Sequence, residues 1–257
     1  SKCHPIHAMA SPAVPSPADT QLALQNQLRA APAHFDPRQL PLAPAPAPHI
    51  ALPALHLQPD FLRQRFAHAS TPPPPEIYER PRLDQPLSAS TVLLALVQRE
   101  GGLHVLLTQR ASHLRNHSGQ IAFAGGRIDP SDAHVVACAL REAREEIGLT
   151  AEHIEILGTL APYTTGSAFE ITPVVALVRP GFHLRINPAE VQSAFEIALD
   201  HLMSPQHHHL QQAQVNDITR HWWAIPSVDT QGQDRFVWGA SAGILRNLYQ
   251  FLRSHDA

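Results

Sequence analysis

From Ser88 onward, the pattern of apolar and polar residues predicts alternating strands and helices. Val92 to Val97 is an uninterrupted aliphatic run, which is typical of a strand buried on both faces. Gly101 and Gly102 follow it and predict a hairpin turn into the next strand. Near the C-terminus, apolar residues recur at helical spacing, as Ile244, Leu245, Leu248, Phe251 and Leu252. We expect strands at 91–98, 103–109, 154–162 and 171–178, and helices at 133–147, 188–201 and 240–253.

Strands interleaved with helices predict a layered α/β architecture for residues 88–257. The residues before it differ in composition, because 17 of the 25 prolines precede residue 85. We interpret residues 1–18 as a disordered tail and residues 19–87 as an arm packed on the globular domain. Short helices are expected at 20–29 and 59–66. The alternative for the proline-rich arm is a docking ligand for another protein.

Composition and charge exclude several classes of protein. The formal net charge is −3 and no basic block is present, so nucleic acid is not an expected partner. The longest aliphatic run is far too short to span a membrane, and we see no secretory signal. Two cysteines, Cys3 and Cys138, do not form a disulfide framework, which fits a reducing cytoplasm.

The helix expected at 133–147 carries the most informative chemistry. Glu142, Glu145 and Glu146 stand at i, i+3 and i+4, so they share an arc of about 100° on one face. Like charges at this spacing repel, and a cation would offset the repulsion. Carboxylate oxygens on one helix suit Mg²⁺ or Mn²⁺, which also take substrate phosphates. The alternative is a solvated acidic face.

The ends of this helix have their own signals. Asp132 is placed to cap the N-terminus, and Gly148 stands where a left-handed residue commonly ends a helix. Cys138 lies one turn before Glu142 and is interpreted as a small packing residue.

The segment from Gly125 to Leu149 resembles the Nudix box, G-x5-E-x7-R-E-U-x-E-E-x-G-U, in which U is a bulky aliphatic residue. Its final part, REAREEIGL, matches with Ala143 in place of the first aliphatic residue. The first part departs from the pattern. Asp132 stands in place of the glutamate, and eight residues rather than seven separate it from Arg141.

A second motif lies upstream, from Leu106 to Gly126. It is similar to LLTxR(SA)xxxRxxxGxxxFPGG, the extra motif of the coenzyme A pyrophosphatase branch of the Nudix hydrolases, with Ala124 in place of the proline. The resemblance runs from about Thr91 to Leu252 and implies a Nudix α/β/α sandwich with a mixed sheet. It also implies hydrolysis of the pyrophosphate of coenzyme A and its thioesters. Alternatives are another nucleoside diphosphate derivative, such as ADP-ribose or NADH, and a non-catalytic nucleotide-binding module.

The resemblance also assigns roles to residues. The metal ligands would be Glu142, Glu145, Glu146 and the carbonyl of Gly126, and Arg141 would orient Glu142. The general base stays open between Glu142, Glu190 and Glu196. Substrate contacts are expected from Arg110, Arg115, His117, Gly125 and Gly126, although both arginines could instead be ordinary surface residues. Nudix proteins often form dimers, so a homodimer is an open expectation.

Two further clusters are given structural interpretations. His207, His208 and His209 are expected in a solvated loop and not in a metal site. Trp222 and Trp223 are expected in the core or at a dimer contact.

Overall fold

A computed structural model describes residues 36–68, 76, 86–113, 119–215 and 218–254. The tail expected at 1–18, the helix expected at 20–29, Arg115 and His117 lie outside the described residues.

The main sheet is mixed, as the sequence resemblance implies. Its central strand, β2 (Ser88–Arg99), runs antiparallel to β3 and β5 and parallel to β8. β3 also pairs with β4 and β9, and β8 also pairs with β6 and β7. The bounds of these strands are β3 (Gly102–Arg110), β4 (Ile121–Ala122), β5 (Ala124–Arg127), β6 (Ile154–Thr159), β7 (Tyr163–Thr164), β8 (Phe169–Val178) and β9 (Val191–Ala198).

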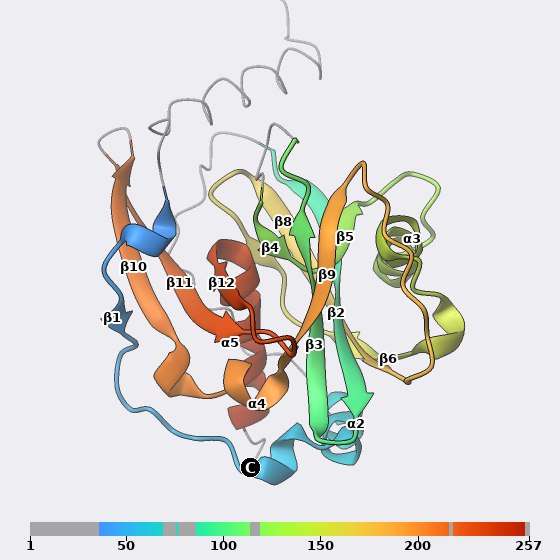
Figure 1. The fold of residues 1–257 in the computed structure, drawn as a ribbon, viewed down its shortest axis with the longest axis horizontal. Helices are drawn as coiled ribbons and strands as arrows, with labels where there is room; N and C mark the ends of the chain where they lie inside the picture. Colours follow the sequence, from blue (N-terminus) through green and yellow to red (C-terminus); the bar gives the residue numbers. More distant parts are fainter. Residues whose placement is uncertain (1–35, 69–75, 77–85, 114–118, 216–217, 255–257) are drawn as a thin grey trace, which may run out of the picture. The chain divides into compact units, whose positions relative to one another are not determined.

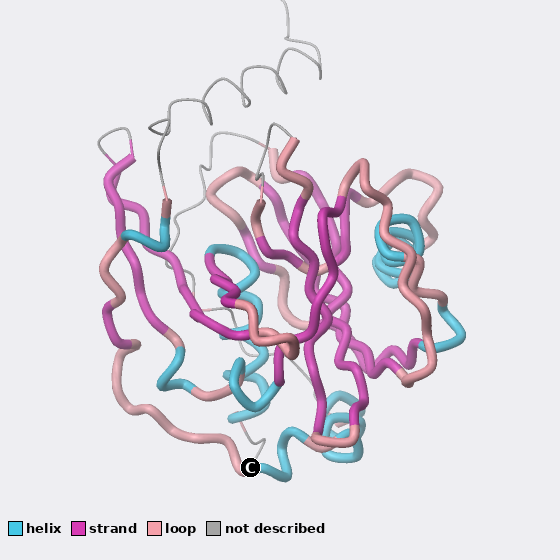
Figure 2. Tube along the Cα trace, in the orientation of Figure 1, coloured by secondary structure: helices cyan, strands magenta, loops and turns pink. Residues whose placement is uncertain are grey.

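A second, antiparallel sheet was not predicted. It has the order β1-β10-β11-β12, with bounds β1 (Ala43–Pro44), β10 (His209–Val215), β11 (Ile218–Val228) and β12 (Asp234–Trp238). Helix α5 (Gly239–Arg253) lies between the two sheets, and α3 (Val135–Ile147) covers the opposite face of the main sheet (Figure 1). Figure 2 shows the same layers by secondary structure. Both long helices occur where the apolar periodicity predicts them.

The alternating side chains of β2 explain how one strand supports two cores. Leu94 and Leu96 point into the cluster that contains α5 and β11. Leu93, Ala95 and Val97 point the other way, into the cluster formed with α3. A strand buried on both faces needs an uninterrupted apolar run, which this segment has.

Short helices complete the described fold: α2 (Pro59–Ala67), α4 (Leu199–Leu202), η1 (Pro37–Gln39), η2 (Ala54–Leu57), η3 (Ala151–His153) and η4 (Pro205–His207). α2 confirms the helix expected at 59–66. Its Leu62 is fully buried, and Phe66 contacts Phe251 of α5 with ring centroids 4.6 Å apart. None of the described helices combines the length and apolar character that a membrane span needs.

The prediction of a helix at 188–201 is wrong. Residues from Val191 to Ala198 form β9, which pairs with β3, and only the short α4 follows. Val191, Phe195 and Leu199 are spaced like one face of a helix, and this spacing misled the prediction. Pairing along the edge of the main sheet decides the outcome instead.

The prediction of a solvated loop for His207, His208 and His209 is also wrong, because His207 ends η4 and His209 begins β10. His208 is 1% exposed, its Nε2 donates to the Leu202 carbonyl at 2.7 Å, and its Nδ1 accepts from Arg246 at 3.2 Å. Burial lowers the pKa of His208 to about 4. Trp222 and Trp223 are buried in the core, as predicted.

Candidate active site

Helix α3 ends as the sequence predicts but begins differently. Gly148 has a φ of 70°, and its N–H donates to the carbonyls of Ala143 and Arg144. At the other end the cap is His134, whose Nδ1 accepts from the N–H of Ala137 at 3.1 Å. The prediction that Asp132 caps the helix is therefore wrong. Asp132 contacts Arg141 instead.

Arg141 connects the acidic residues around the helix. Its Nε and Nη2 donate to the two oxygens of Asp132 at 3.0 and 2.9 Å. Its Nη1 donates to Glu142 at 2.9 Å and to Glu145 at 3.1 Å. The Arg141–Glu142 contact expected from the sequence is present. The hydrogen bonds from Arg141 lower the pKa of Asp132, so Asp132 stays ionised and fixes the guanidinium.

The role of Asp132 was missed because its position departs from the Nudix pattern. An aspartate is one methylene shorter than a glutamate, and one extra residue precedes the arginine. The two-pronged contact shows that the carboxylate nevertheless reaches Arg141. The missed signal was that arginine prefers to pair with a carboxylate through two parallel hydrogen bonds.

The three glutamates of α3 differ in exposure. Glu145 is exposed, Glu142 is half-buried, and Glu146 is only 7% exposed. The N–H of Gly125 points at Glu146 at 3.4 Å. Burial, followed by the charges of Glu142 and Glu190, raises the pKa of Glu146 to about 8. Burial also raises the pKa of Glu142. Holding these carboxylates together is therefore costly without a cation.

Two glycines bring the backbone of β5 close to this helix. A Cβ on Gly126 would overlap the carboxylate of Glu142. A Cβ on Gly125 would overlap the backbone of Thr91 and Val92 in β2. Backbone atoms of β2 leave room only for glycine at position 125, whereas a side chain at position 126 would displace the carboxylate of Glu142.

The carboxylates do not converge as they stand. In the part of the chain that the structure describes, no group of three His, Cys, Asp or Glu side chains is arranged to hold a metal ion. Arg141 holds Glu142 and Glu145 to one side. The donor types nevertheless fit a hard divalent cation, because α3 carries three carboxylates and that of Glu142 lies against the backbone of Gly126.

Arg110 and Glu190 approach the same helix from outside it. The positive charge of Arg110 opposes the rise in the pKa of Glu146. The negative charge of Glu190 contributes to the raised pKa of both Glu142 and Glu146. Arg110 is the last residue of β3, and its N–H and carbonyl pair with Gln120 and Gly119 across the loop that follows. Glu190 is linked to the C-terminal turn of α3 through Asn187, whose backbone N–H donates to the Glu146 carbonyl and whose side chain donates to Glu190.

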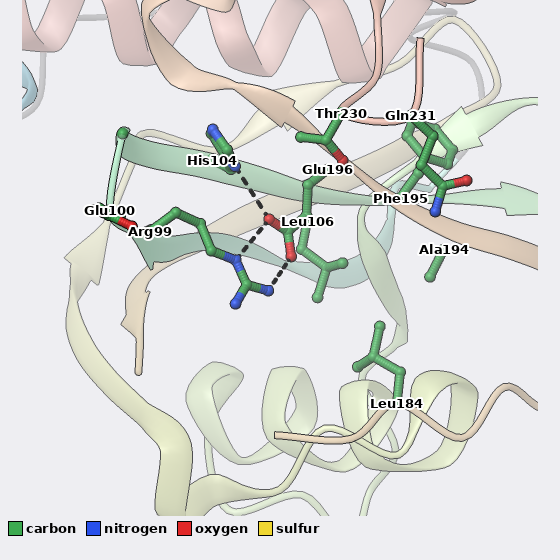
Figure 3. Close-up of a pocket in the computed structure, with 11 residues that line it drawn as sticks. Arg99, Glu100, His104, Leu106, Leu184, Ala194, Phe195, Glu196, Thr230 and Gln231 are labelled. Carbon is green, nitrogen blue, oxygen red and sulfur yellow. Dashed lines mark hydrogen bonds and ion pairs between the residues drawn. The ribbon is translucent and has the colours of Figure 1, made fainter. Parts of the chain in front are cut away.

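Glu196 lies elsewhere. It belongs to β9, six positions beyond Glu190, toward the opposite end of the strand. Arg99 donates to it at 2.5 Å and His104 Nδ1 at 3.2 Å. These residues line a pocket of about 510 Å³ at the β2–β3 hairpin, beside Leu184 (Figure 3). The structure does not bring Glu196 to the acidic residues of α3.

Cys138 of α3 is buried and lies beside Arg141. Its thiol donates to the carbonyl of Arg127 at 3.4 Å, and burial raises its pKa to about 11. The thiol is therefore protonated at neutral pH, which fits the packing role expected from the sequence.

Comparison with known proteins decides the family. Residues 87–226 match the family profile described as NUDIX domain. The chain belongs to the Nudix family. It is 41% identical over 160 residues to the Nudix hydrolase NudL of Enterobacter sp. (strain 638), a match that covers 62% of this chain and 80% of the relative. NudL of Photorhabdus laumondii is 35% identical over 183 residues, or 70% of this chain and 90% of the relative.

Solved Nudix structures also resemble the chain. A Nudix hydrolase from M. smegmatis, RenU, has a TM-score of 0.40 and 24% identity, covering 49% of this chain and 81% of that one. An Ap4A hydrolase from C. elegans has a TM-score of 0.38 and 20% identity, covering 44% and 82%. The family profile and the NudL relatives, and not these distant structures, identify the protein as a Nudix hydrolase, and enzymes of this family generally use divalent cations.

Proposed function

We propose that this Nudix hydrolase cleaves the pyrophosphate bond of coenzyme A and its thioesters, with Mg²⁺ or Mn²⁺ as cofactor. The products would be 3′,5′-ADP and 4′-phosphopantetheine or its acyl form. The observation that carries the proposal is the acidic cluster of α3, in which Arg141 bonds to Glu142 and Glu145 and the carboxylate of Glu142 lies against Gly126. The charge of Arg110, at the end of β3, favours ionisation of Glu146 in this cluster. Arg110 also belongs to the upstream motif that resembles the coenzyme A branch.

The residues of α3 and β5 would hold the cation. Glu142, Glu145, Glu146 and the carbonyl of Gly126 are the proposed ligands, because they supply the hard oxygens that Mg²⁺ and Mn²⁺ prefer. When bound, the cation would neutralise phosphate charge and make the attacking water more acidic. Arg141, fixed by Asp132, would keep Glu142 in place against Gly126.

Arg110 would bind an anionic group of the substrate. A guanidinium offers planar, paired donors that match phosphate oxygens. The sequence motif adds Arg115 and His117 as proposed substrate contacts, along with the backbone of Gly125 and Gly126. The sequence leaves open whether the arginines contact the diphosphate or the 3′-phosphate. We propose that at least one binds the 3′-phosphate, which distinguishes coenzyme A from simpler ADP derivatives.

Glu142 and Glu190 are the two carboxylates that we propose as acceptors of the proton of the attacking water. Glu142 and Glu190 both lie at the acidic helix. Glu196 is not proposed, because Arg99 and His104 hold its carboxylate in a separate pocket. Water would attack one phosphorus atom, the bridging P–O bond would break, and the second phosphate would leave.

The rival substrates are other nucleoside diphosphate derivatives, and the rival role is nucleotide binding without catalysis. The intact set of Arg141, Glu142, Glu145 and Glu146 argues against the second. The test is to measure kcat/KM for coenzyme A, ADP-ribose and NADH, each with Mg²⁺ and with a chelator. Metal-dependent preference for coenzyme A supports the proposal. Preference for ADP-ribose or NADH would replace it, and no turnover of any substrate would favour the binding module.

A further inference from the structure

We propose that Asn187 is a positioning residue that orients the carboxylate of Glu190 toward Glu142 and Glu146. This inference rests on the proposed function, because it assigns Glu190 to the cation site. Asn187 lies in the segment between β8 and β9, which bonds to the C-terminal end of α3 through the N–H groups of Arg185 and Asn187.

Asn187 contacts both elements that it would align. Its backbone N–H donates to the carbonyl of Glu146 at 2.8 Å, which attaches this segment to the C-terminal turn of α3. Its side-chain Nδ2 donates to Oε1 of Glu190 at 3.1 Å. A single residue therefore connects the helix that carries the acidic face to the carboxylate that approaches it from outside.

The side chain of Asn187 also shapes the turn before Glu190. Its Oδ1 accepts from the N–H of Ala189 at 3.1 Å, and its carbonyl accepts from the N–H groups of Glu190 and Val191. The turn reverses the chain within a few residues. It allows β9 to begin at Val191 while Glu190 stays at the end of the strand nearest α3.

The two functions of the side chain use different atoms. The amide nitrogen binds Glu190, and the amide oxygen holds the turn. The hydrogen bond from Nδ2 uses one acceptor site of Oε1 and fixes the plane of the Glu190 carboxylate, whose remaining acceptor sites can contact the cation or the water. A free glutamate would adopt several rotamers, and the hydrogen bond restricts them at small energetic cost.

The separation of atoms allows a clean experiment. Asn187→Ser keeps an oxygen that accepts from the N–H of residue 189 but has no donor that reaches Glu190. Asn187→Ala removes both. Each is compared with Glu190→Gln and with the double variant Asn187→Ser/Glu190→Gln. Thermal unfolding of every variant separates loss of the turn from loss of the contact.

The first readout is Mn²⁺ binding by the metal-free protein, measured by electron paramagnetic resonance without substrate. We expect Asn187→Ser to weaken Mn²⁺ binding about 3- to 10-fold in the wild-type background, and to have no further effect when Glu190 is already glutamine. The second readout is kcat and KM on the substrate that the wild type cleaves fastest. We expect Asn187→Ser to lower kcat by about 10-fold with little change in KM.

The outcomes are distinguishable from failure of the proposed function. If Asn187→Ser binds Mn²⁺ like the wild type, or if its effect persists fully in the Glu190→Gln background, the inference is wrong. If only Asn187→Ala has an effect and its melting temperature falls, Asn187 serves the turn alone. If Mn²⁺ binding responds as expected but the wild type cleaves no diphosphate substrate, the proposed function fails while the inference stands.

Discussion

Glu146 combines a structural cost with a proposed role as a metal ligand. The fold buries this carboxylate between α3 and β5, close to Glu142 and Glu190. Burial of a charge without a partner is unfavourable. Glu145, one residue earlier, is exposed and bonds to Arg141. The two neighbouring glutamates should therefore respond differently to substitution.

We predict that Glu145→Gln and Glu146→Gln each reduce turnover by at least about 100-fold at saturating Mg²⁺, since each removes one hard ligand. Without metal, Glu146→Gln should raise the melting temperature slightly at neutral pH, because the fold no longer has to hold protonated a buried carboxyl group that ionises freely in the unfolded chain. Glu145→Gln should leave it unchanged. Steady-state kinetics and thermal unfolding in chelator check both expectations. Near-normal activity of both variants would exclude this helix as the metal site.

Arg110 and Arg115 test substrate selection. Arg110 and Arg115 are each replaced with alanine. Loss of an arginine that binds the 3′-phosphate should then lower kcat/KM for coenzyme A by about 10- to 100-fold, which corresponds to roughly 1.5–3 kcal/mol. The same change should hardly affect 3′-dephospho-coenzyme A. Equal losses on both substrates would place the arginines at the diphosphate. No loss on either substrate would mean that they are ordinary surface residues.

At the scale of elements, local signals predicted α3 and α5 well but failed for β9. α3 has an amphipathic pattern and a glycine stop at Gly148, and both signals lie within the segment itself. β9 is a strand because β3 offers it a pairing edge, and that information is distant in sequence. The second sheet was missed for the same reason, and because Pro226 lies inside β11.

The end of α3 gives an element-scale prediction. Gly148 has a φ of 70°, and an added Cβ would crowd the backbone of Arg185. Gly148→Ala should destabilise the protein by roughly 1–2 kcal/mol, the usual cost of a left-handed residue with a side chain. Gly101→Ala is the matched control, because its φ is ordinary and the space around it is open. Urea unfolding should separate the two variants, and equal stabilities would contradict this account of the helix stop.

At the scale of the whole molecule, the sequence predicted the mixed sheet and the helix layers but not how residues 36–68 attach. Contacts in that segment join residues far apart in the chain. Tyr249 donates to the carbonyl of Ile50 at 2.6 Å, and Arg65 lies over the ring of Phe251 at 4.2 Å. Composition indicated an arm but could not identify its partners, since proline-rich sequence has little apolar periodicity.

Truncation tests the arm. Removing residues 1–18 should change neither activity nor melting temperature, because the segment has little apolar surface to bury. Removing residues 1–87 should lower the free energy of unfolding by at least on the order of 3 kcal/mol, since buried Leu62 and Phe66 would be lost. Differential scanning calorimetry provides the comparison. An unchanged melting temperature in the longer truncation would show that the arm is a free linker.

The proposed hydrolysis of coenzyme A at the acidic helix is tested most directly by mass spectrometry of the products formed from coenzyme A and Mg²⁺ in ¹⁸O-labelled water, with Glu146→Gln as a parallel sample. We predict 3′,5′-ADP and 4′-phosphopantetheine, with the label in only one of the two product phosphates, and intact coenzyme A with the variant. Recovery of unreacted coenzyme A from the wild type, or release of its 3′-phosphate as inorganic phosphate, would contradict the account.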